Sequence, residues 1–138
     1  MRLEITRRAD LAVRAMALLA EGRRLKAGEL AERLATTPGF VPQVIGPLVK
    51  GGWVRSVPGP TGGYALVVTP EHVSVLDVIE AVDGPTDTGQ CVVADVPCGR
   101  GTPCALHAAW SHARVELTAS LQAVSVAEVT ATAGVAAR

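Results

Sequence analysis

The sequence of 138 residues predicts a mainly α-helical fold with a small β-hairpin, followed by one long helix. Three observations predict this fold. Apolar residues recur at helical spacing through the first 50 residues. A dense run of Gly and Pro then separates two short strand-like segments, which is typical of a hairpin. A last helical pattern, with a stripe of small and aliphatic residues, follows a loop rich in Gly and Pro.

The first 50 residues contain three short helical patterns. The first is expected over about 6–20, where Thr6 is a suitable N-cap residue. The second covers about 27–35. A turn at 36–39 leads to the third pattern, whose apolar stripe runs over 41–49.

The third predicted helix contains two prolines. Pro42 is compatible with a helix only in the first turn, where its missing N–H is not needed. Pro47 lies deeper, so we expect it to remove one backbone hydrogen bond and to bend the helix.

Two strands, 53–57 and 64–68, are expected to form the hairpin. Three short helices followed by a two-stranded hairpin is the order of a winged helix-turn-helix domain. The third helix would then be the recognition helix and the hairpin the wing. A further helix capped by Ser74 completes this predicted DNA-binding domain, which we assign to residues 1–84.

The rest of the chain divides into three expected parts. Residues 85–103 form a cysteine-containing loop, 104–130 a dimerisation helix with the C-terminal segment, and 131–138 a frayed tail. The long helix is expected to start at Pro103, with Thr102 as its N-cap. A helix with a stripe of small residues after a complete domain is typical of a dimerisation element.

The net charge of zero conceals an asymmetry. Residues 1–60 carry ten basic and five acidic side chains, whereas residues 61–138 carry three and eight. The net charge of +5 over residues 1–60 favours a polyanion-binding module, and the net charge of −5 over residues 61–138 favours a module with another task.

No apolar run approaches the roughly 18 residues of a membrane span. Asp10 and Arg14 exclude a signal peptide, so we expect a cytoplasmic protein whose thiols stay reduced.

Three cysteines and a histidine share one segment, with the spacing Cys91-x6-Cys98-x5-Cys104-x2-His107. In a helix starting at Pro103, Cys104 and His107 share a face, and the helix dipole favours the Cys104 thiolate. Three thiolates plus one further donor suit an iron–sulfur cluster or a Cys3His zinc site. The alternative of buried core cysteines fits a loop rich in Gly and Pro poorly.

With these motifs in place, the chain resembles the IscR, NsrR and RirA family of bacterial winged-helix iron–sulfur transcription regulators. The resemblance covers about residues 1–129. The segments that carry it are RADLAVRA at 8–15, VPGPTGGYAL at 57–66, VSVLDVIEAVDG at 73–84 and CALHAAW at 104–110. The resemblance implies a homodimer that binds a palindromic operator in double-stranded DNA and carries an iron–sulfur cluster on three cysteines.

The resemblance offers two candidates for the fourth cluster ligand. His107 matches the histidine that completes a two-iron cluster in the IscR branch. Asp10 matches the position from which the partner subunit completes the cluster in the NsrR branch. The ordinary alternatives are a solvated His107 and an Asp10 that complements the dipole of the first helix. We favour His107, and with it a two-iron over a four-iron cluster, although the first cysteine gap is one residue longer than in the nearest IscR-type pattern.

DNA-binding candidates follow from the resemblance, position by position. They lie at the start of the recognition helix, in the wing and at nearby cations: Thr37, Gly39, Phe40, Gln43, Lys50, Arg55, Thr61, Arg7 and Arg8. Gln43 is the candidate for base readout, because an amide can form two hydrogen bonds to adenine. The cations are candidates for phosphate contact, and the alternative for each is a solvated surface charge. Pro58 and Pro60 flank the wing glycine where relatives often carry an Arg, which argues against insertion of this wing into the minor groove.

Two other function classes were weighed. A zinc-stabilised or metal-free winged-helix regulator shares the same sequence features and differs only in its metal. An enzyme is disfavoured, because the chain lacks a phosphate-binding Gly-rich loop and a nucleophile elbow. Cys104 and His107 could mimic a nucleophile and its base, but no third group is placed to orient them.

Overall fold

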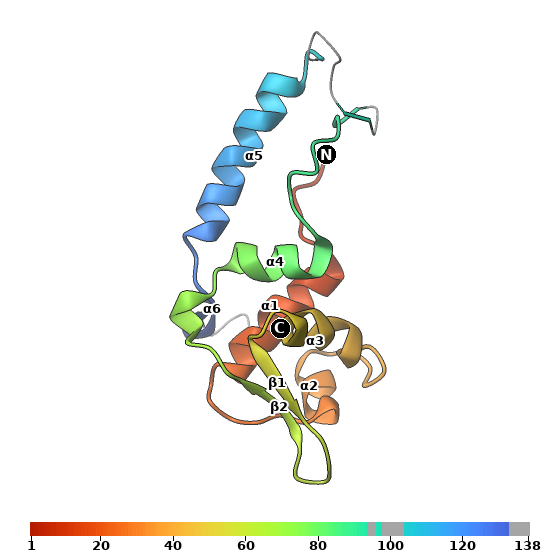
Figure 1. Ribbon diagram of the computed structural model, residues 1–138, viewed down its shortest axis with the longest axis vertical. Coiled ribbons are helices and arrows are strands. Elements are labelled where there is room, and N and C mark those ends of the chain that lie inside the picture. The colour runs from red at the N-terminus through yellow and green to blue at the C-terminus, as the bar shows by residue number, and fades with distance from the viewer. Residues whose placement is uncertain (94–95, 98–103, 133–138) are drawn as a thin grey trace.

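The computed structural model describes residues 1–93, 96–97 and 104–132. It shows a body of short helices and one hairpin, from which a single long helix stands out (Figure 1). The elements in chain order are α1 (Arg7–Leu19), α2 (Ala27–Arg33), α3 (Val41–Lys50), β1 (Val54–Val57), β2 (Gly63–Leu66), the 3-10 helix η1 (Pro70–His72), α4 (Val75–Asp83), α5 (His107–Gln122) and α6 (Val126–Ala131). The predicted mainly α-helical fold with a small hairpin is confirmed.

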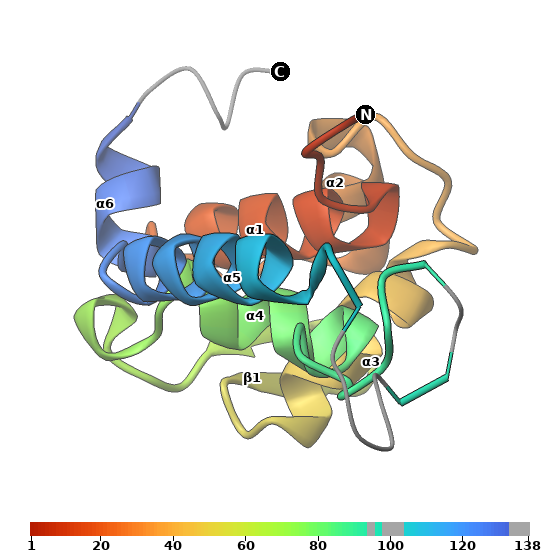
Figure 2. The same cartoon turned by 90° about the horizontal axis from the view of Figure 1, so that it is seen from above.

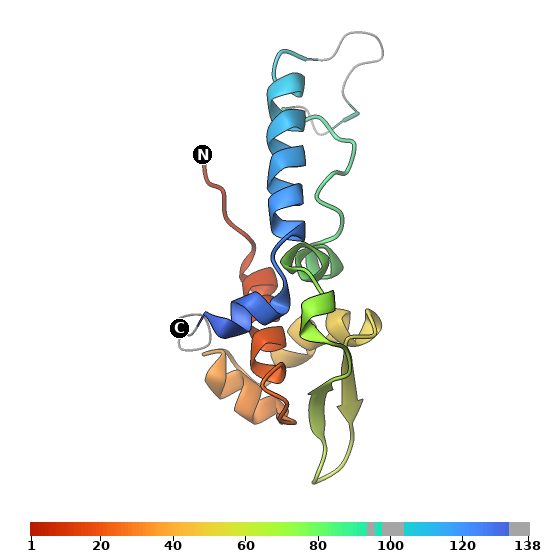
Figure 3. The ribbon, with the colours of Figure 1, turned by 90° about the vertical axis from the view of Figure 1, so that its left-hand side faces the viewer.

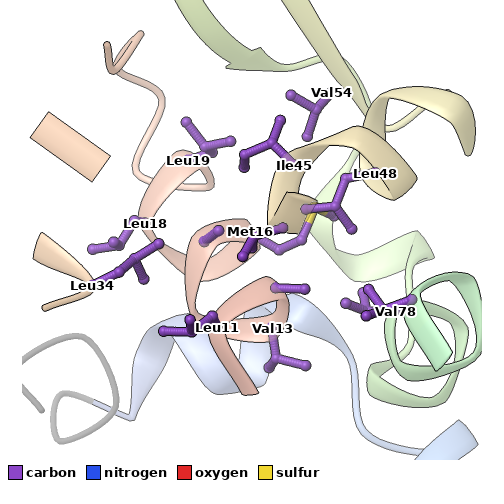
Figure 4. Close-up of a cluster of buried hydrophobic side chains, with 14 of the residues drawn as sticks. Leu11, Val13, Met16, Leu18, Leu19, Leu34, Ile45, Leu48, Val54 and Val78 are labelled. Carbon is purple, nitrogen blue, oxygen red and sulfur yellow. The ribbon is translucent and has the colours of Figure 1, made fainter. Parts of the chain in front are cut away.

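Helix α1 forms the centre of the hydrophobic core. Ten of its thirteen residues are buried, and it packs against α3, α4 and α6. Side chains of Met16, Ile45, Leu48 and Val78 gather between α1, α3 and α4 (Figure 4). Removal of these aliphatic side chains from water is the main stabilising contribution to this body.

Local capping interactions define where the helices of this body begin. The Thr6 hydroxyl accepts a hydrogen bond from the Ala9 N–H at 3.1 Å, as predicted for an N-cap. Ser74 and Asp77 form a reciprocal capping box at the start of α4, with bonds of 3.0 and 2.9 Å. Both starts were predicted from the sequence, because a capping interaction needs only residues three positions apart.

Helix α3 accommodates both of its prolines. Pro42 occupies the first turn, the place that its missing N–H requires. Pro47 lies inside the helix, which continues to Lys50, so this proline does not end it. The predicted apolar stripe is buried except at its last position, since Val49 is exposed.

The wing is a short antiparallel hairpin in which Val54 pairs with Leu66 and Val57 with Gly63. Its strands are shorter than predicted, because Trp53, Val67 and Val68 lie outside the paired segment. The hairpin projects from the body in the direction opposite to α5 (Figure 3).

Helix α5 starts later than the sequence predicts. It begins at His107, with Leu106 as N-cap, and not at Pro103. The preceding backbone forms a turn closed by a bond of 3.0 Å from the His107 N–H to the Cys104 carbonyl. The predicted cap pair Thr102-Pro103 lies outside the described residues. No helix in the described part of the chain is long and apolar enough to span a bilayer.

The chain after α5 is hydrogen-bonded to the body and then forms the short helix α6. The Val75 N–H donates to the Val124 carbonyl, and the Val126 N–H to the Val73 carbonyl, both at 2.8 Å. Helix α6 packs on α1, and its first residue, Val126, is fully buried. This helix was not predicted as an element separate from the C-terminal segment. Of the predicted frayed tail, residues 133–138 lie outside the described part of the chain.

Candidate functional site

The part of the fold formed by α1–α4, the hairpin and α6 is called the winged body below. Two of the three cysteines lie close together at the end of α5 that is remote from this body. The Cys91 N–H donates to the Val96 carbonyl at 2.7 Å. The Sγ atoms of Cys91 and Cys104 lie 3.7 Å apart. This distance is nearly twice the roughly 2.04 Å of a disulfide bond, so the two sulfurs are not bonded to each other. Residues separated by 13 positions are therefore brought face to face.

A cavity of about 260 Å³ surrounds this pair of sulfurs. Its lining residues come from the first half of α5 and from the segment that follows α4. Both segments extend from the body toward the same end of the molecule (Figure 1), and seen from above they lie next to each other (Figure 2). Its lining residues are Asp87, Gly89, Gln90, Cys91, Val92, Cys104, His107, Trp110, Ser111 and Arg114. Cys98, the third predicted cysteine ligand, lies outside the described residues.

The donor set fits a tetrahedral metal centre. Two thiolates at the usual metal–sulfur distance of about 2.3 Å from one tetrahedral ion lie about 3.8 Å apart. The observed 3.7 Å between Cys91 and Cys104 matches this separation. No group of three His, Cys, Asp or Glu side chains among the described residues is arranged to hold a metal by itself.

One part of the predicted site geometry is wrong. Cys104 and His107 do not share one helix face, because α5 begins only at His107. Cys104 precedes the helix by three residues, within the turn that its carbonyl closes with the His107 N–H. Cys104 therefore lies outside the first turn of α5, where it was predicted. Cys104 and His107 nevertheless line the same cavity.

Asp10 lies in a different part of the molecule. It is in the first turn of α1, and α4 lies between α1 and the cysteine end of α5 (Figure 1). Its carboxylate is 3.6 Å from the guanidinium of Arg14 and 3.8 Å from that of Arg7. Arg14 is only 5% exposed and also donates to the Leu34 carbonyl at 3.4 Å. Within one chain, Asp10 therefore balances a buried cation and complements the dipole of its own helix.

Sequence reasoning missed three residues that line the cysteine cavity. Asp87 and Arg114 form an ion pair of 3.3 Å, which connects the segment after α4 to α5. Trp110 forms part of the wall on the α5 side. His107, Trp110 and Arg114 recur at i, i+3 and i+7 and so lie on one face of α5, a spacing that could have pointed to Trp110 and Arg114. The approach of Asp87 to Arg114 depends on the path of the chain after α4, which no local pattern predicts.

The predicted DNA-binding residues lie on the winged body. The exposed ones are Thr37, Gly39, Gln43, Lys50, Arg55, Thr61 and Arg7. Phe40 is half-buried and packs against the core. Two cations have partners within the fold, because Arg7 faces Asp10 and the Arg8 guanidinium donates to the Val82 carbonyl.

The sequence and the fold of this chain are similar to those of known transcription regulators. The model of the Rrf2 family, described as "Iron-dependent Transcriptional regulator", matches residues 5–132. The "HTH-type transcriptional regulator IscR" of Aliivibrio salmonicida is 32% identical over 130 residues, which are 92% of this chain and 77% of that protein.

Two solved structures share the fold. CymR, the global cysteine regulator of B. subtilis, is 20% identical, with a TM-score of 0.76 over 94% of this chain and 98% of that one. The IscR of T. potens is 23% identical, with a TM-score of 0.75 over 95% of this chain and 88% of that one.

Proposed function

Because the chain belongs to the Rrf2 family of transcriptional regulators, we propose that it is a homodimeric regulator whose DNA affinity is controlled by an iron–sulfur cluster. Cys91, Cys98 and Cys104 would hold the cluster. The family consists of transcription regulators and not of enzymes, which supports a DNA-binding role for this chain. We expect it to act on chromosomal DNA in the cytoplasm.

The observation that carries the proposal is the approach of Cys91 to Cys104, 3.7 Å between sulfurs, inside a cavity that His107 also lines. Thiolates are the usual ligands of iron–sulfur clusters. The family model's description as iron-dependent and the match to an IscR support iron over zinc. A bound cluster would supply a redox-sensitive and chemically labile group at this point.

His107 is our candidate for the fourth ligand, and a two-iron cluster our candidate for the cofactor. The position of His107 on the wall of the cavity that Cys91 and Cys104 also line supports His107 as the ligand. The partner subunit's Asp10 is the second candidate. Its role in neutralising the buried Arg14 argues against it, because a ligating carboxylate would give up part of that interaction.

The exposed surface of α5 supports the proposed homodimer. None of the sixteen described residues of this helix is buried. The exposed fractions of Val115, Leu117 and Trp110 are 63%, 44% and 37%. A second copy of the chain would remove these side chains from water, which a single chain does not achieve.

The place of the cysteines supports coupling between the cluster and DNA. The cysteine cavity lies at one end of α5, and the other end is bonded to the winged body through Val124. In a dimer, a shift of α5 would change the distance between two recognition helices. These two recognition helices must lie about 34 Å apart to enter successive turns of the major groove. A small change in their separation would therefore change the affinity for DNA. Gln43 would read base edges, and Lys50 and Arg55 would contact phosphates.

Metal analysis of protein purified without oxygen tests the proposal. The sample should be brown and contain iron and acid-labile sulfide. Cys91→Ser should lose both, and His107→Ala should change the visible spectrum more than the exposed-surface control His112→Ala. Colourless protein that contains one zinc per chain would replace the proposal with a zinc-stabilised regulator.

A further inference from the structure

The tip of the wing has no charged side chain of its own. Residues 58–63 read Pro-Gly-Pro-Thr-Gly-Gly, and Gly59, Pro60 and Thr61 are exposed. A wing that approaches DNA meets the negatively charged backbone, where cationic side chains provide most of the affinity. By itself, the tip of this hairpin could offer the DNA backbone only its own N–H groups and the Thr61 hydroxyl.

A cation reaches the tip from another part of the chain. The Arg24 Nη1 donates a hydrogen bond of 2.7 Å to the Thr61 carbonyl, although the two residues are 37 positions apart. Arg24 belongs to the segment between α1 and α2, and its side chain is exposed. The wing therefore carries a guanidinium that its own sequence lacks.

Backbone pairing holds this segment against the wing. The Tyr64 N–H donates to the Leu25 carbonyl at 2.7 Å, and the Leu25 N–H donates to the Tyr64 carbonyl at 3.0 Å. At Gly63 the backbone φ is +131°, and an added Cβ would lie 2.7 Å from the Leu25 oxygen. The close approach of the two segments thus requires glycine at this position. Arg24 is held next to the tip before any DNA binds.

We propose that Arg24 is the cation through which this wing contacts the DNA backbone. The inference rests on the proposed function, because it assumes that the wing faces DNA. A guanidinium has five N–H donors in a rigid plane, so one can bond Thr61 while others bond a phosphate. Lys26, also exposed, lines the hollow of about 250 Å³ between the start of α2 and the wing and adds positive charge beside Arg24.

The neighbouring Arg23 provides a matched control. It has the same charge and adjoins Arg24 in the chain, but its guanidinium faces Glu29 at 3.7 Å. Loss of either side chain lowers the net charge equally. Only the loss of Arg24 removes the cation from the wing tip.

Salt titrations of DNA binding test the inference. The full-length variants Arg24→Ala, Arg23→Ala and Arg24→Lys are compared on a mixed-sequence duplex of about 30 base pairs, long enough for two half-sites. Arg24→Ala should weaken binding at least about tenfold and reduce the salt slope by about 0.9 for each subunit. Arg23→Ala should stay within about twofold with an unchanged slope, and Arg24→Lys should recover part of the loss. Circular dichroism should show the same folded content in all variants.

Two outcomes would overturn the inference. If Arg24→Ala and Arg23→Ala weaken binding equally, only the total charge matters and Arg24 has no special role. If affinity falls but the salt slope is unchanged, Arg24 only shapes the wing and contacts no phosphate. In both cases the proposed function stands, whereas a wild-type protein that binds no duplex would refute both proposals.

Discussion

The winged body differs from α5 and the cysteine segment before it in how stability is supplied. In the body, α1 is almost entirely buried and its neighbours enclose it on several sides. Along α5, none of the described residues is buried. The body therefore has a complete hydrophobic core within one chain. The α5 region lacks such a core, and in our account a second subunit and a cluster complete it.

A pair of leucines provides the largest contrast between the two regions. Leu11→Ala in α1 removes a fully buried side chain and should lower the free energy of unfolding by about 3 kcal/mol. Leu117→Ala in α5, where the side chain is 44% exposed, should cost less than about 1 kcal/mol in dilute protein but weaken self-association. Urea unfolding and sedimentation measure the two effects. Equal losses of unfolding free energy would contradict this division of the molecule.

Two glycines test the rigidity of the wing within the body. Gly63 and Gly59 both have positive φ, but only at Gly63 would a Cβ collide with the backbone oxygen of Leu25. Gly63→Ala should cost about 2 kcal/mol, and Gly59→Ala about 1 kcal/mol from its φ alone. Thermal unfolding measures both. A smaller cost at Gly63 would show that the segment holding Arg24 is not clamped to the wing.

Two ion pairs provide the smallest contrast. Asp87→Asn breaks the 3.3 Å pair with Arg114 beside the cysteine cavity, and Glu21→Gln breaks a 3.8 Å pair of the body with Arg33. Each change should alter the unfolding free energy by less than about 1 kcal/mol, because the carboxylate of each pair is exposed to water. Asp87→Asn should raise the rate at which a chelator removes iron by about threefold or more relative to wild type, because the segment before Cys91 would be held less firmly. Glu21→Gln should leave that rate unchanged. Equal chelation rates would exclude a role for Asp87 in holding the cluster loop.

The same division explains what the sequence could predict. Within the body, helix starts depend on residues a few positions apart, so Thr6 and Ser74 were identified as caps and the buried stripes of α1 and α3 followed from spacing. The start of α5 was misplaced, because the Thr102-Pro103 pattern suggests a first helical residue at Pro103, four residues before the helix begins at His107. Local pattern alone does not decide whether a turn continues as a helix.

Contacts between distant residues were out of reach of spacing arguments. The cysteine spacing predicted a shared site but not which sulfur atoms lie closest to each other. The approach of the Cys91 and Cys104 sulfurs to 3.7 Å joins residues thirteen positions apart, which spacing alone does not determine. The bonds of Arg24 to Thr61 and of Asp87 to Arg114 likewise join segments with no pattern in common. These are the contacts on which the functional proposals depend.

If the cluster controls DNA affinity, the affinity must change when iron is removed, and a paired binding measurement decides whether it does. Protein purified without oxygen is assayed before and after iron removal, on a duplex selected from a random pool. The account predicts affinities that differ at least about tenfold, or about 1.4 kcal/mol. Cys91→Ser should bind with the iron-free affinity whether or not iron and sulfide are supplied. Equal affinities for the two forms, with iron and sulfide counts that differ, would contradict the account.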